Sequence, residues 1–196
     1  MSRARRACLT FVPVVVLSCV LAAPALAKEK RKEKEKLAAA YSMVILPEAG
    51  SDNQSPSELS VEIERFTTPE ERANLRSILQ SKGQNAALTA AQNSPVGRLS
   101  RPASLATNIL YAWQEPDPAG NRITIVTLRY SIHPNMVMNA DPMLEPFTLA
   151  WFVPAADGKG KGKIIGSAAL KLDKDGKLDI SAYPASTADL AYVKIR

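Results

Sequence analysis

Cysteine is almost missing from this chain, and the little there is lies at its start. The 196 residues include two cysteines, Cys8 and Cys19, and both fall within the first 27 residues. A chain that loses this segment keeps no thiol. That excludes a disulfide framework, cysteine zinc sites and cysteine nucleophiles.

Histidine is scarcer still, because His133 is the only one. A Ser-His-Asp triad would have to use it, and no serine lies in a G-x-S-x-G turn. Neighbouring carboxylates occur at 62 and 64 and at 70 and 71, where a solvated strand face and a helix start explain them. We therefore predict a protein that is not an enzyme and uses no cofactor.

Excess positive charge is missing from most of the chain. The formal net charge is +6, with 25 basic and 19 acidic residues, but the first 36 residues hold all of the excess. From Leu37 onward, 16 basic residues stand against 16 acidic ones. Because nucleic-acid binders carry a basic patch, we expect no nucleic-acid partner.

What is present is an export signal. Arg3, Arg5 and Arg6 precede an apolar run over 9–21, and Ala25-Leu26-Ala27 follows it. This order is typical of a signal peptide cut after Ala27, and the run is shorter than the roughly 20 residues of a membrane span. We predict a periplasmic or extracellular protein with no transmembrane segment after cleavage. The alternative is a lipid anchor at Cys19.

Two further regions follow the predicted signal peptide. Residues 28–40 begin with alternating Lys and Glu, which indicates a solvated spacer or, alternatively, a weak tether to an anionic surface. Residues 41–196 are predicted to form a single domain, large enough to bury a core without disulfides.

Local patterns predict an α+β fold. Thr68, Pro69 and Glu71 form a helix start with a capping box, and Gly83 ends or bends that helix before a second one over 84–92. Apolar alternation predicts strands over 41–46, 61–66, 105–113, 122–132, 147–153, 164–172, 178–182 and 190–195. We expect two helices from the N-terminal half to pack on a curved, mainly antiparallel sheet of about six to eight strands.

Two details refine these predicted strands. The alternation slips at Ile125 and Val126, which indicates a bulge or burial on both faces. The segments 157–163 and 173–176 are rich in Gly, Asp and Lys and are predicted to be turns. In the second, a hairpin is favoured over a fragment of a calcium loop.

Methionines gather beside the single histidine. His133, Met136, Met138 and Met143 lie within eleven residues of one another. Thioether and imidazole groups are ligands for Cu(I), so these four residues form a candidate soft-metal site. The alternative is that the methionines fill gaps at the margin of the core.

Aromatic residues are concentrated in the β-rich half. They could line a pocket of the curved sheet for a small apolar ligand, or they could simply form the core. These residues are Tyr111, Trp113, Tyr130, Trp151 and Phe152.

A resemblance adds an expectation of export but no activity. The run ERFTTPEERANL over 64–75 and the later VGRLS over 96–100 resemble a family of exported bacterial proteins of unknown function. The Gly120-Asn121-Arg122 turn, PFTL over 146–149 and a Lys-Gly-Lys hairpin fit it too. The resemblance implies no catalytic residue. We predict a non-enzymatic binding or structural module whose partner is an unknown protein or a small apolar ligand.

Overall fold

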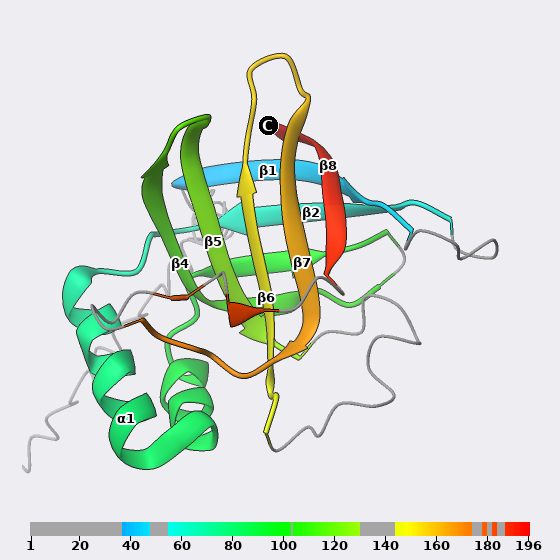
Figure 1. Ribbon diagram of the computed structural model, residues 1–196. Coiled ribbons are helices and arrows are strands. Elements are labelled where there is room, and N and C mark those ends of the chain that lie inside the picture. Colours follow the sequence, from blue (N-terminus) through cyan, green and yellow to red (C-terminus); the bar gives the residue numbers. More distant parts are fainter. Residues whose placement is uncertain are drawn as a thin grey trace, which may run out of the picture. The chain divides into compact units, whose positions relative to one another are not determined.

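A computed structural model of the chain describes residues 37–47, 55–102, 104–129, 144–173, 178–179, 182–183 and 187–196. Eight strands and one helix are found in these residues, and Figure 1 shows their arrangement. The strands are β1 (Ala39–Ile45), β2 (Ser57–Ile63), β3 (Gly97–Ser100), β4 (Thr107–Asp117), β5 (Gly120–Leu128), β6 (Phe147–Val153), β7 (Gly160–Ala168) and β8 (Ala188–Ile195).

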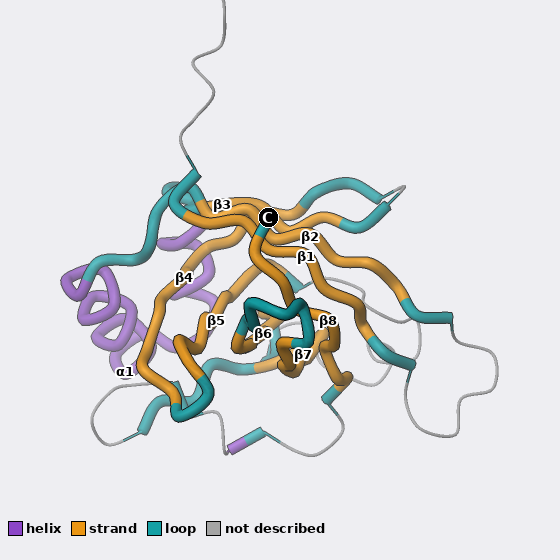
Figure 2. The backbone as a smooth tube through the Cα atoms, turned by 90° about the horizontal axis from the view of Figure 1, so that it is seen from above, coloured by secondary structure: helices purple, strands orange, loops and turns teal. Residues whose placement is uncertain are grey.

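The strands form a closed antiparallel barrel. Each strand pairs with the next one along the chain, and β8 returns to pair with β1. Figure 2, which looks from above, shows the strands arranged as a ring. The register shifts by a residue at several pairs, including β1 with β8 and β4 with β5. Such bulges increase twist and bend the strands, as a small closed barrel requires.

The predicted fold class is therefore wrong. The sheet does not lie open and curved under two helices: it closes on itself, and only one helix is present among the described residues. Closure depends on backbone hydrogen bonds between β1 and β8, at opposite ends of the described chain. Hydrophobic alternation indicates where strands are but not which distant strand each one pairs with.

The helix α1 (Pro69–Gln92) connects β2 to β3 and lies outside the ring, beside β4 (Figure 2). Its predicted start is confirmed: the Thr68 side chain accepts from the Glu71 N–H, and Glu71 accepts from the Thr68 N–H. The predicted break at Gly83 is also confirmed: its φ of 81° and ψ of −172° are not helical, so α1 consists of two helical segments that meet at a kink (Figure 1). Glycine tolerates this backbone conformation.

The inside of the barrel is filled with apolar side chains. Alternate residues of every strand point inward, and most of them are fully buried. The Tyr41 and Phe152 rings meet edge to face, with centroids 5.1 Å apart, and so join β1 to β6. The largest fully buried members are Ile45, Leu59, Ile63, Leu99, Ile109, Ile123, Ile125, Phe152 and Ile164.

A second apolar cluster lies outside the barrel. It covers the outward faces of β4 to β7 and packs against α1 and the chain that follows β7. Strand β5 is thus buried on both faces, as its sequence predicted: Ile123 and Ile125 point into the barrel, and Val126 joins the outer cluster. A cavity lies in the space between these outward strand faces and α1.

Candidate functional site

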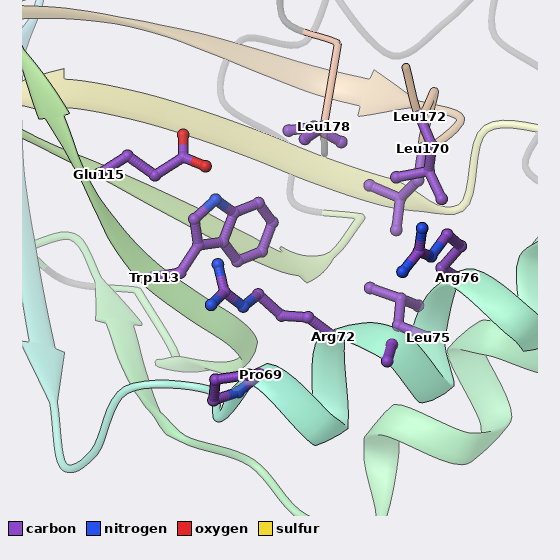
Figure 3. Close-up of a pocket in the computed structure, with 10 residues that line it drawn as sticks. Pro69, Arg72, Leu75, Arg76, Trp113, Glu115, Leu170, Leu172 and Leu178 are labelled. Carbon is purple, nitrogen blue, oxygen red and sulfur yellow. The ribbon is translucent and has the colours of Figure 1, made fainter. Parts of the chain in front are cut away.

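A cavity of about 170 Å³ lies between α1, β4 and three leucines that follow β7, at positions 170, 172 and 178. Figure 3 shows its lining residues. Most are apolar, and they come from parts of the chain that are far apart in sequence. The lining consists of Pro69, Arg72, Ala73, Leu75, Arg76, Trp113, Glu115, Leu170, Leu172 and Leu178.

Trp113 contributes an aromatic ring to the lining of the cavity. Its position on β4 directs the ring away from the barrel interior and into the outer cluster. The residue is only 6% exposed, so its ring is held firmly by the surrounding side chains. Leu75 of α1, itself buried, and Leu170 face the same space, and together they make an apolar floor.

Two arginines give the cavity its polar wall. Arg72 and Arg76 are four residues apart on α1, so they lie on one face of the helix. Figure 3 shows both side chains extending from α1 toward the space between Trp113 and the leucines. The Arg72 Nε is buried and has no hydrogen-bond partner in the part of the chain that the structure describes.

The first turn of α1, from which Arg72 and Arg76 follow, is fixed by an ion pair and by its capping box. Arg65 donates two hydrogen bonds to the Glu71 carboxylate, at 2.8 and 2.9 Å, and a third to Ser94 at 3.0 Å. The bonds from Arg65, and then the one from the Thr68 N–H, keep the pKa of Glu71 below its ordinary value. Glu71 is therefore ionised at neutral pH and fixes the first turn of α1.

Glu115 is the one carboxylate in the lining, and it forms an ion pair with an arginine. Arg122 on the neighbouring strand donates to Glu115 at 2.8 Å and lies 3.8 Å from Asp117. The carboxylate thus belongs to an ion-pair cluster on the β4–β5 hairpin. Arg72, whose Nε has no hydrogen-bond partner among the described residues, is the charged group of the lining that a ligand could engage.

Hydrogen bonds hold residues 169–171, which follow β7, beside the cavity. The Gln84 side chain donates to the Leu170 carbonyl and accepts from the Leu170 N–H, both at 2.9 Å. The Tyr183 hydroxyl donates to the Ala169 carbonyl and accepts from the Lys171 N–H. Burial raises the pKa of Tyr183 to about 12, so the hydroxyl keeps its proton.

The structure separates the aromatic residues that were expected to line one pocket. Trp113 lines the cavity, whereas Phe152 lies inside the barrel. Tyr111 is buried in the outer cluster, and Trp151 packs beside Tyr183. A single pocket of the sheet does not contain them. Tyr130 lies outside the described residues.

Other predicted site residues cannot be placed. His133, Met136, Met138 and Met143 lie outside the described residues, as do Cys8 and Cys19, so the soft-metal site and the export signal stay predictions. Within the described residues, no group of three or more His, Cys, Asp or Glu side chains could hold a metal ion. No described helix is both long and apolar enough to cross a membrane.

The sequence patterns did not predict Arg72 and Arg76 as site residues, because a charged residue beside the apolar face of a helix is usually solvated. The signal that could have found them is their four-residue spacing next to Leu75. Comparison of the chain with protein families, with curated proteins and with solved structures finds no match.

Proposed function

We propose that this protein is an exported binding protein. Its ligand is a small anion with an apolar body, held in the cavity between α1 and the barrel. The observation that supports the proposal is the composition of the cavity, where Trp113 and four leucines face two arginines. Apolar walls with a few placed polar groups are the usual make-up of ligand sites.

The volume limits the ligand. A cavity of about 150 Å³ holds one benzene molecule, so about 170 Å³ admits a ring or a short branched chain. A guanidinium group presents a planar fork of donors that suits a carboxylate. The ligand class is therefore a carboxylate attached to a ring-sized apolar group.

The barrel interior is a less suitable carrier pocket. Its inward residues include Ile63, Leu99, Ile109 and Phe152, each with no exposed surface. A ligand there would have to displace closely packed side chains. We therefore place the apolar-ligand site outside the barrel wall.

Three probes of matched shape test the proposal: benzoate, benzamide and benzylamine. Titration is followed by the NMR signal of the Trp113 indole N–H. We expect benzoate to bind in the millimolar range and at least tenfold more tightly than benzylamine, since hydrogen bonds to charged groups contribute about 1.5–3 kcal/mol.

Variants locate the binding. Arg72→Gln should remove most of the preference for benzoate, and Ala73→Phe, at an exposed lining position, should block the cavity without disturbing the core. Arg98→Gln is the matched control, because Arg98 is exposed on β3 and away from the cavity. Equal affinity for benzoate and benzylamine, or the same loss in the Arg98 variant, would contradict the proposal.

A further inference from the structure

A second concave surface lies on the outside of the barrel, away from α1. It is a groove of about 520 Å³ across the outward faces of β8, β1, β2 and the end of β3. The groove shares no lining residue with the cavity proposed to bind an anion. The side chains of the groove therefore determine what it can bind, independently of the cavity.

Three serines form the floor of the groove. Strand register places Ser42 opposite Ser60, Ser60 opposite Ser100, and Ser42 opposite Lys194 on the other side. Residues directly opposite each other in antiparallel strands point to the same face. The hydroxyls thus form a row across the strands at intervals of about 4.8 Å, close to the length of one sugar ring.

The walls of the groove carry both donors and acceptors. Glu58 and Glu62 flank the serine row on β2, and Lys194 and Arg196 extend from the C-terminal strand. Arg196 donates to the Ser60 hydroxyl at 2.7 Å. Charges of both signs disfavour a strongly charged ligand, but they suit hydroxyl groups, which donate and accept at once.

One aromatic side chain stands on the groove wall. Tyr192 is 62% exposed, although most large apolar side chains in the described residues are buried. It sits at the bulge of β8, where two residues oppose one residue of β1 between Ser42 and Val44. An exposed ring beside a polar floor offers an apolar face on which the C–H face of a sugar can pack.

One hydroxyl of the floor also lacks a partner. The Ser42 Oγ is buried and makes no hydrogen bond with any described residue. A covered polar atom without a partner costs free energy, which a ligand hydroxyl would recover. Lys194, the neighbour of Ser42 across the strands, is exposed and lines the same groove.

We infer that this groove is a binding site for a neutral saccharide of about two sugar rings. The Tyr192 ring packs against one sugar face, and the serine row together with Glu58, Glu62 and Arg196 bonds the hydroxyls. The size agrees, because the groove lies in the range of about 300–1,000 Å³ that is usual for sites of small molecules.

Titration of the purified protein with cellobiose, maltose and N,N′-diacetylchitobiose, followed by backbone NMR, tests the inference. We expect at least one disaccharide to shift the signals of β1, β2 and β8. Sorbitol, which has hydroxyls but no ring face, should not. Shifts produced only by sulfate or by an acidic peptide would overturn the inference, as would no shift in these strands with any disaccharide.

Variants of Tyr192 separate binding from folding. Tyr192→Gly removes the ring and suits the backbone at this position, so it should fold normally and bind roughly tenfold more weakly. Tyr192→Phe keeps the ring and should keep binding. Ser42→Val fills the floor with a residue that favours strands and should also weaken binding. Unchanged affinity in Tyr192→Gly would overturn the inference.

Discussion

Tyr192 adopts a backbone conformation that a tyrosine does not favour. Its φ is 54°, and it is the one residue other than glycine with a positive φ in the described part of the chain. The left-handed region costs an L-residue about 1–2 kcal/mol because Cβ approaches the following carbonyl oxygen. The bulge of β8 imposes this conformation, and the pairing of β8 on both sides maintains it.

Replacing Tyr192 should reveal this strain as a gain in stability. Tyr192→Gly relieves the steric cost, while the greater freedom of glycine in the unfolded chain offsets about 0.4–1 kcal/mol of it. We expect Tyr192→Gly to be about 1 kcal/mol more stable than Tyr192→Ala, measured by urea unfolding. Tyr192→Ala is the control, since it lacks the ring but keeps Cβ. Equal stability of the two variants would argue against strain.

Two glycines at the start of β7 show where a local pattern misleads. Gly160 and Gly162 belong to a stretch predicted as a turn, yet both lie within β7. A Cβ on Gly160 would lie 2.5 Å from the carbonyl oxygens of Val153 and Val193, and one on Gly162 would collide with Trp151 and Phe152. Glycine is needed there because neighbouring strands approach closely, which is a tertiary cause that sequence alone does not display.

At the scale of elements, the start of α1 was predictable because its determinants are local. Thr68, Pro69 and Glu71 lie within four residues, and their contacts depend only on the helix geometry. The contact of Glu71 with Arg65, and that of Arg65 with Ser94, were not predicted. The second depends on how the chain returns after α1, and no spacing in the sequence records that path.

The Glu71 carboxylate should make stability depend on pH. Its pKa is lowered in the folded state, mainly by the hydrogen bonds from Arg65. The unfolded chain then binds more protons in acid, so the contribution is present above the unfolded value of about 4.3 and is lost as pH falls through the lowered folded pKa. Both side chains of the pair are more than a third exposed, which limits the effect.

Glu71→Gln tests this expectation. The variant should be about 1 kcal/mol less stable at neutral pH, and its stability should fall less between about pH 5 and pH 3. Thermal unfolding across this range measures both effects. Glu58→Gln, on an exposed position of β2, serves as the control. A parallel pH dependence of the Glu71 variant and the wild type would show that the pair contributes nothing.

At the scale of the whole molecule, the fold depends on the packed barrel interior. Phe152 has no exposed surface, and its ring contacts Tyr41 from the other side of the interior. Burial also raises the pKa of Tyr41. This contact links an early strand to a late one, and the sequence predicted both strands without predicting that they meet.

Phe152→Ala should destabilise the whole barrel. We expect a loss of about 3–5 kcal/mol, from lost apolar burial and the cavity left behind. The urea midpoint measured by circular dichroism and the one measured by tryptophan fluorescence should fall by the same amount, because a closed barrel unfolds as a unit. Leu105→Ala is the control, since Leu105 is 92% exposed and should cost almost nothing. Separate transitions for the two probes would contradict a single cooperative unit.

The pairing of β8 with β1 has a further consequence for recognition. Every described strand pairs with a neighbour on each side, although β3 covers only Thr107–Ile109 of β4. Addition of a strand from another chain is therefore restricted to the rest of β4, and elsewhere a partner must be recognised through side chains, as in the cavity and the groove. The pairing of β8 with β1 thereby protects two strands of this apolar, β-rich sequence from growth into extended β-assemblies.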